Sequence, residues 1–255
     1  MAFLTAHHTD VGIKKKTNQD ALLLKTAKTP KGPVGLFIIC DGMGGLSHGE
    51  LASATVIRGM AEWFDAEMPR ISLSEHIEQE IYLEVEKCIK QLNEKILNYG
   101  ETSKVKLGTT LTALLIVHNK YYIAHIGDSR AYSISNSLNQ LTKDQTLVAR
   151  EVARGNITDE QAKMDPRRNV LLQCVGATKE IETNFSTGDV QANTVFMLCS
   201  DGFYHQITEE ELALNLKPDT ITNDQQLKDK VVELVELVKA RKELDNISVV
   251  AAKVL

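Results

Sequence analysis

The stretch Leu36-Phe-Ile-Ile-Cys-Asp41-Gly42 is a continuous apolar run that ends at an Asp-Gly pair, and Val195-Phe-Met-Leu-Cys-Ser-Asp201-Gly202 repeats this pattern. Short apolar runs of this kind predict strands that are buried on both faces. A carboxylate then projects from each strand end, and the glycine lets the chain turn while its carbonyl stays accessible to a ligand. One Asp-Gly pair usually marks only a turn, but two such pairs after near-identical strands favour a functional site.

Further strands and three helices surround these two runs. Periodicity and β-propensity predict strands at 21–25, 34–40, 109–117, 120–126, 131–134, 195–199 and 247–254, with a tight hairpin turn at His118-Asn119. Apolar residues at helical spacing predict one helix from near Gly49 to a point before Pro69, a second behind a Ser74 cap through Ile96, and a third over 227–238. Strands before, between and after helices, without strict alternation, predict sheets covered by helices.

Length and composition indicate one domain. A chain of 255 residues with 43% hydrophobic and 25% charged residues is typical of a single globular core. The N-terminus lacks the features of a secretory signal, and the four cysteines are isolated, so we expect a reducing cytoplasm and neither disulfides nor zinc. A net charge of -5 argues against a nucleic-acid partner, and no apolar stretch is long enough to predict a membrane span.

Three more aspartates lie in polar turns or at strand edges. Asp20 ends Thr17-Asn-Gln-Asp, Asp128 follows Gly127, and Asp245 directly precedes the last predicted strand. Hard divalent ions such as Mg²⁺ and Mn²⁺ prefer oxygen ligands, and carboxylates that converge from separate strands would supply them. The scarcity of cysteine and histidine pairs argues against zinc.

Along its whole length the chain resembles the metal-dependent protein phosphatases, also called type 2C protein phosphatases, and in particular their small bacterial members. The resemblance rests on Thr9-Asp-Val-Gly, Thr17-Asn-Gln-Asp20-Ala, Asp41-Gly-Met-Gly-Gly, Gly108-Thr-Thr, Gly127-Asp-Ser-Arg-Ala-Tyr, Pro166-Arg-Arg-Asn-Val-Leu, Ser200-Asp-Gly and Asp245-Asn-Ile-Ser in the family's order. It implies an α+β fold, a four-layer sandwich of two antiparallel β-sheets flanked by α-helix pairs, with the metals at one end of the sandwich.

The resemblance also implies a set of metal ligands, namely Asp20, Asp41, Gly42, Asp128, Asp201 and Asp245. Within this set it implies that Asp41 bridges two ions and that Gly42 offers its carbonyl to one of them. Asp20, Asp201 and Asp245 are expected to complete the coordination of the other ion. Asp128 is expected to hold a third, weaker ion together with Asp201, although from the residues alone Asp128 is also compatible with a cap of the turn before Arg130.

The implied reaction is hydrolysis of phosphoserine and phosphothreonine by a water that bridges two Mg²⁺ or Mn²⁺ ions, with catalytic roles for Asp41, Asp201 and Lys15. Two neighbouring ions lower the pKa of such a water and neutralise charge on the phosphoryl oxygens. We therefore expect a phosphoprotein substrate, phosphorylated by a separate serine/threonine kinase, and a monomeric signalling enzyme with no nucleic-acid or membrane partner.

The sequence departs from the family pattern at several positions. Lys15 stands where members often have an arginine that grips the substrate phosphate, and a lysine cannot reproduce that bidentate geometry. Met43 stands where eukaryotic members carry a histidine, and Lys143-Asp-Gln-Thr146 replaces a common Asp-His-Ser. The segment 145–194 is expected to form a flap, locally basic through Arg150, Arg154, Arg167 and Arg168, which is compatible either with an acidic substrate surface or with a solvated helix face.

Three rival functions remain open at this point. A pseudophosphatase would keep the fold without turnover, and Lys15 is its only support. A serine hydrolase would use Gly127-Asp-Ser129, but no histidine follows His205 to complete a triad. A metabolite phosphatase with an aspartyl-phosphate intermediate would need an Asp-x-Asp pair, which is absent around Asp41 and Asp201.

Overall fold

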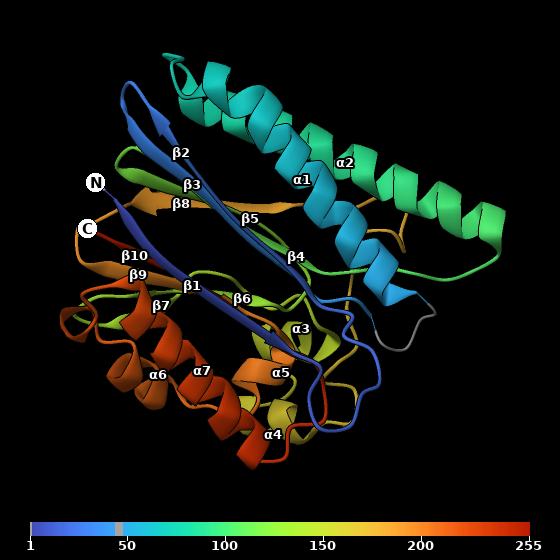
Figure 1. Ribbon diagram of the computed structural model, residues 1–255. Coiled ribbons are helices and arrows are strands. Elements are labelled where there is room, and N and C mark those ends of the chain that lie inside the picture. Colours follow the sequence, from blue (N-terminus) through green and yellow to red (C-terminus); the bar gives the residue numbers. More distant parts are fainter. Residues whose placement is uncertain (1, 44–47) are drawn as a thin grey trace.

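Two antiparallel sheets packed face to face form the centre of the molecule, and helices cover both outer faces (Figure 1). The computed structural model describes residues 2–43 and 48–255. In this part of the chain each sheet has five strands, in the orders β1-β10-β9-β6-β7 and β2-β3-β4-β5-β8. The predicted four-layer α+β sandwich is therefore confirmed.

The elements have the following bounds. The strands are β1 (Phe3–Asp10), β2 (Ala21–Thr29), β3 (Gly32–Cys40), β4 (Leu111–Val117), β5 (Lys120–Ile126), β6 (Arg130–Ile134), β7 (Leu138–Gln140), β8 (Asn184–Asp189), β9 (Thr194–Cys199) and β10 (Ile247–Val254). The α-helices are α1 (Gly49–Ile71), α2 (Ile77–Ser103), α3 (Leu147–Ala153), α4 (Asp159–Met164), α5 (Asp201–Tyr204), α6 (Glu209–Asn215) and α7 (Asp224–Ala240), and a 3₁₀ turn covers Pro218–Thr220.

Strand β3 shows why the apolar runs are continuous. Leu36, Ile38 and Cys40 belong to the core between the second sheet and the α1–α2 pair. The alternate residues Phe37 and Ile39 belong to the core between the two sheets. Since successive side chains of a strand point to opposite faces, both faces of β3 are buried and both must be apolar.

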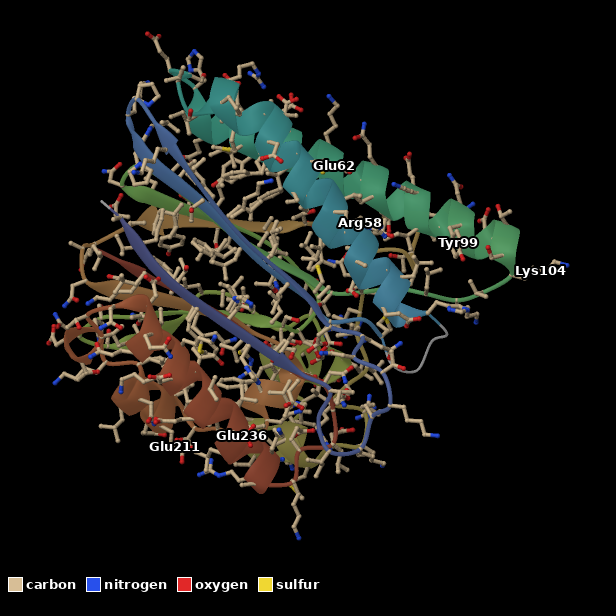
Figure 2. The ribbon with its side chains drawn as sticks, viewed as in Figure 1. Arg58, Glu62, Tyr99, Lys104, Glu211 and Glu236 are labelled. Carbon is tan, nitrogen blue, oxygen red and sulfur yellow. The ribbon has the colours of Figure 1, made fainter. Side chains whose placement is uncertain are left out.

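The helices present one apolar side to a sheet and a charged side to solvent. α1 and α2 cover the second sheet, while α7 lies against β1 and β10 of the first sheet and α6 lies beside β7. Arg58 and Glu62 on α1 and Glu236 on α7 point away from the sheets (Figure 2). The helix pairs thus complete the outer layers of the sandwich.

Two predicted helix ends differ from the structure. Helix α1 continues through Pro69 to Ile71, because buried Met68 and Ile71 anchor its last turn, and the Ser72 amide donates to the Met68 carbonyl. Ser74 does not cap α2, which begins at Ile77. Its hydroxyl instead bonds the His76 amide and the Glu80 carboxylate, which fastens the loop between α1 and α2.

Three strands were not predicted: β1, β7 and β8. β7 and β8 are edge strands with mostly polar residues, so neither carries the apolar signal of a central strand. β1 pairs along its whole length with β10, from Phe3 opposite Val254 to Asp10 opposite Ile247. The two ends of the chain therefore lie side by side (Figure 1).

The segment 145–194 has two different parts. Its beginning contains the short helices α3 and α4, and α4 has no buried residue. Its last part forms edge strand β8, which pairs with β5 and belongs to the second sheet. No helix in the described residues is long and apolar enough to cross a bilayer.

Candidate functional site

Five aspartates meet at one end of the sandwich. Asp41 follows β3, Asp201 opens α5 behind β9, Asp20 precedes β2, Asp128 lies between β5 and β6, and Asp245 precedes β10. The charges of the other four all act on Asp41. Strands from both sheets thus deliver to one place the carboxylates that the sequence singled out.

The main chain of Asp41 is held by the adjacent strand. Its amide donates to the Thr110 hydroxyl at 2.8 Å, and its carbonyl accepts from the Thr110 amide at 2.9 Å and from the Thr109 hydroxyl at 2.9 Å. These are the two threonines of Gly108-Thr-Thr, for which sequence reasoning gave no role. Their role in the structure is to fix the backbone from which the Asp41 carboxylate projects.

Gly42 lies at a point of close backbone approach. Its amide donates to the Gln19 carbonyl at 3.1 Å, and a Cβ at this position would lie 2.5 Å from that oxygen and 2.6 Å from the Gly49 backbone. A larger residue would push apart the loop before β2 and the start of α1. The rest of Asp41-Gly-Met-Gly-Gly, Gly44 and Gly45, lies outside the described residues.

Asp20 and Asp201 are the residues that best test whether a metal fits. Asp20 Oδ2 accepts from the Ser200 hydroxyl at 2.9 Å. Its Oδ1 and the Oδ1 of Asp201 are buried and have no hydrogen-bond partner among the described residues. A buried carboxylate oxygen without a partner is costly, and oxygen-preferring cations are suitable partners.

The electrostatics of the cluster point the same way. Burial, followed by the charges of neighbouring aspartates, raises the pKa of Asp20 to about 7 and the pKa of Asp41 well above its usual value. The same causes raise the pKa of Asp128 well above its usual value, and burial is the main cause of the raised pKa of Asp201. Without a cation, burial and mutual repulsion thus favour the protonated form of these carboxyl groups, and divalent cations bound among them would favour the ionised form.

The carboxylates are not arranged as a finished cage. No group of three or more His, Cys, Asp or Glu side chains within residues 2–43 and 48–255 is spaced to chelate one ion. Like charges at close range repel, and Ser200 and Lys15 hold two of the carboxylates through other contacts. The donor set fits Mg²⁺ or Mn²⁺ in chemistry, and binding would require side-chain rotation.

Lys15 contacts the aspartate cluster through an ion pair with Asp245. Its Nζ lies 2.6 Å from Asp245 Oδ1. The loop that carries Lys15 is fastened by Asn246, whose amide group donates to the Val11 carbonyl at 2.9 Å and whose Oδ1 accepts from the Gln19 amide at 2.9 Å. Asn246 was quoted within a motif but not assigned a role, and it ties the loop to the turn that bears Asp245.

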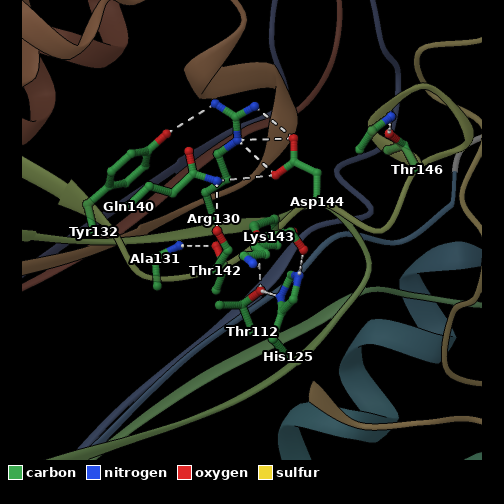
Figure 3. A network of polar contacts seen from close by, with 12 residues as sticks. Thr112, His125, Arg130, Ala131, Tyr132, Gln140, Thr142, Lys143, Asp144 and Thr146 are labelled. Carbon is green, nitrogen blue, oxygen red and sulfur yellow. Dashed lines mark hydrogen bonds and ion pairs between the residues drawn. The ribbon is translucent and has the colours of Figure 1, made fainter. Parts of the chain in front are cut away.

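A second polar network is centred on Arg130, two residues after Asp128 in the sequence (Figure 3). Arg130 donates three hydrogen bonds to Asp144, at 3.0, 3.3 and 2.7 Å, and one to the Tyr132 hydroxyl at 3.2 Å. Its guanidinium also lies 3.7 Å from the ring centroid of Tyr204 in α5. Arg130 therefore connects the segments that carry Asp128 and Asp201 with Asp144, the residue directly before the segment 145–194.

The residues after Asp144 also have structural roles. Gln145 Oε1 accepts from the Gly127 amide at 2.9 Å, and the Thr146 hydroxyl caps α3 by accepting from the Ala149 amide. The departure at Lys143-Asp-Gln-Thr146 thus keeps the turn before Asp128 in place. The sequence alone indicated no structural role for this departure.

The serine-hydrolase reading fails on geometry. Ser129 is fully buried, and its hydroxyl bonds the Thr110 hydroxyl at 2.8 Å. A nucleophilic serine must reach substrate and a histidine base. Ser129 instead helps to fix the strand beside Asp41.

The comparisons with known proteins agree with this geometry. The family model described as Protein phosphatase 2C matches residues 8–246. The chain belongs to the protein phosphatase 2C family. It is therefore an enzyme, a metal-dependent protein serine/threonine phosphatase, as the motifs predicted. The aspartyl-phosphate reading does not fit this family, whereas a pseudophosphatase would share its fold and is distinguished by the turnover assay proposed below.

Individual relatives of this 2C phosphatase cover almost the whole chain. "Protein phosphatase PhpP" of Streptococcus pneumoniae is 33% identical over 245 residues, which is 94% of this chain and 93% of the relative. The structure of the S. agalactiae serine/threonine phosphatase is 30% identical with a TM-score of 0.85 and covers 100% of both chains. The catalytic domain of the phosphatase PstP, solved with two manganese ions, is 28% identical, covers 98% of this chain and 97% of its own, and has a TM-score of 0.79.

Proposed function

We propose that the aspartate cluster is the metal centre of this phosphatase. In this proposal Asp41 would hold two ions, and Asp20, the Gly42 carbonyl, Asp201 and Asp245 would supply the remaining protein oxygens. The observation that carries the proposal is the burial of unpartnered carboxylate oxygens on Asp20 and Asp201 inside a cluster of like charge. Asp128 is proposed as a ligand of a third and weaker ion, because the charge of Asp201 acts on it.

The proposed ions are Mn²⁺ or Mg²⁺, in line with family usage and with the two manganese ions of the PstP catalytic domain. When bound, they activate water for attack on phosphorus and offset charge on the phosphoryl oxygens. The chain itself supplies the arrangement, because Thr109 and Thr110 fix Asp41 and Ser200 orients Asp20. Lys15 is proposed to bind the substrate phosphate from the loop before β2.

The wider setting is proposed as follows. One phosphatase domain spans 1–255, and the helical part of 145–194 acts as a flap beside the site. The substrate is a phosphoprotein that a separate serine/threonine kinase phosphorylates, and the enzyme acts as a monomer in the cytoplasm. Support comes from the family, from the bacterial serine/threonine phosphatases among its relatives, and from the position of Asp144 and Gln145 between the Asp128 turn and α3.

The test is hydrolysis of a phosphothreonine peptide with Mn²⁺ or Mg²⁺. Activity should disappear with a chelator and return when the ion is restored. Asp41→Asn and Asp201→Asn should each reduce kcat by at least about a thousandfold, since each is proposed to hold the ions that stabilise the transition state.

The matched control is Asp229→Asn, which changes an exposed aspartate on α7 and should leave activity unchanged. Circular dichroism should show that all variants are folded. Turnover that is indifferent to chelator, or a fully active Asp41→Asn, would refute the proposed centre.

A further inference from the structure

Lys15 differs from the two lysines that flank it. Lys14 and Lys16 are exposed, and neither forms an ion pair with any described residue, whereas Lys15 is half-buried and pairs with Asp245 at 2.6 Å. About a third of each partner's side chain is exposed, 33% for Lys15 and 37% for Asp245. One of the three adjacent lysines is therefore built into the carboxylate cluster.

Three carboxylates act on the Lys15 ammonium. Asp245 acts on it through the direct contact, and Asp41 and Asp201 act on it through their charges. A lysine side chain ordinarily carries its positive charge at neutral pH. The positive charge of Lys15 partly neutralises Asp41, Asp201 and Asp245, the same three aspartates that are proposed above as metal ligands.

Asp245 Oδ1 is already in use. It accepts from Lys15 Nζ and also from the Asn246 amide at 2.8 Å. A divalent ion on the same carboxylate would lie within a few ångströms of the ammonium, and the two cations would repel each other. Because lysine is a point charge on a flexible stem, it can leave a carboxylate without movement of its backbone.

We propose that Lys15 and a divalent ion compete for Asp245, and that ion binding releases Lys15 toward the substrate phosphate. This inference rests on the proposed metal centre. It adds that metal loading and phosphate binding are coupled through one side chain. By linkage the coupling is reciprocal: a phosphate that draws Lys15 away from Asp245 also strengthens ion binding.

The experiment is calorimetric titration of the full chain with Mn²⁺, which requires no turnover. Lys15→Met should bind the ion about three- to tenfold more tightly than wild type, because the competing cation is gone. Lys15→Arg keeps the charge and should stay within about twofold of wild type. Lys14→Met is the matched control and should equal wild type.

A second titration adds inorganic phosphate at a fixed concentration. Phosphate should tighten Mn²⁺ binding in wild type, and this gain should be smaller in Lys15→Met. An Mn²⁺ affinity of Lys15→Met equal to or weaker than wild type would overturn the competition. So would an equal gain in Lys14→Met, which would indicate a general effect of net charge.

Asp41→Asn separates this inference from the proposed function. If Asp41→Asn binds Mn²⁺ as tightly as wild type, the proposed centre is wrong and the competition falls with it. If Asp41→Asn loses binding while Lys15→Met equals wild type, the centre stands and only the competition is refuted.

Discussion

His125 is a buried histidine whose two ring nitrogens are both hydrogen-bonded within the protein. It is fully buried in β5, its Nδ1 bonds the Thr112 hydroxyl at 2.9 Å, and its Nε2 bonds the Lys143 carbonyl at 3.1 Å (Figure 3). Burial lowers its pKa to about 4, against the partial opposing effect of its backbone hydrogen bonds and Asp144. The ring therefore stays neutral in the folded protein at pH values where it would be charged in the unfolded chain.

This residue gives a pH-dependent contribution to stability. Between pH 6.5 and about 4 the unfolded state binds the extra proton, so the free energy of unfolding falls as pH falls. From pH 7 to pH 5 the expected loss is about 2 kcal/mol. Urea denaturation of wild type and His125→Gln at both pH values isolates this share, because the other titrating groups are common to both proteins. An identical pH dependence in the two proteins would contradict the assignment.

Individual residues also show which parts of the candidate site could be predicted from the sequence. Asp41, Asp201 and Asp245 were identifiable because each stands at a strand boundary that the apolar pattern marks. Asn246, Thr110 and Ser200 lie in the same motifs, but their roles depend on partners far along the chain, such as Gln19 and Asp20. No local pattern shows such pairings, because they arise only when the sheets pack.

At the scale of elements, the ion pair of Arg130 with Asp144 joins β6 to the loop directly before the segment 145–194. Their side chains are only 25% and 17% exposed, and Arg130 also contacts Tyr204 in α5. Asp144→Asn would leave the guanidinium partly buried without its counter-charge. We expect the free energy of unfolding to fall by about 2 to 3 kcal/mol. This is less than the loss expected for a fully buried ion pair, because some solvent reaches Arg130 and Asp144.

The matched control is Asp65→Asn, which breaks the ion pair of Lys25 with an aspartate whose side chain is 63% exposed. Exposed pairs contribute little, so this loss should stay below about 1 kcal/mol. Urea denaturation in the presence of chelator measures both variants. Equal losses would show that the Arg130 network does not hold its elements together.

Element boundaries also separate what the sequence determines from what packing decides. The central strands were predicted almost residue for residue, because burial on both faces requires continuous apolar runs. The exposed residues of β7 and β8 carry no such requirement. The ends of α1 and α2 were misjudged because the buried residues Met68 and Ile71 outweigh Pro69, and because Ser74 bonds Glu80 as well as the backbone.

At the scale of the whole molecule, the proposed ligands run from Asp20 to Asp245 and come from both sheets. Ion binding should therefore stabilise the fold as one unit. At a Mn²⁺ concentration one hundred times the dissociation constant, the gain is about 2.7 kcal/mol. For a chain of 255 residues this raises Tm by about 5 to 10 °C.

Differential scanning calorimetry checks this expectation. Wild type should show one transition that moves upward with Mn²⁺, and the transition of Asp41→Asn should move much less. Two transitions of which only one responds to the ion would show that the sheets unfold separately. That result would also contradict the single domain proposed for 1–255.

The pairing of β1 with β10 places the two chain ends at the opposite end of these strands from the aspartate cluster. Phe3 lies opposite Val254, and the Leu255 amide donates to the Ala2 carbonyl at 2.9 Å, while Asp245 lies beyond the far end of the same strand pair. Eight residues of strand place that carboxylate roughly 25 Å away. A short peptide can therefore join the present ends, and new ends can open at the exposed tip between β2 and β3. Such a circular permutant would keep every carboxylate in place, although its gene would begin in a different strand.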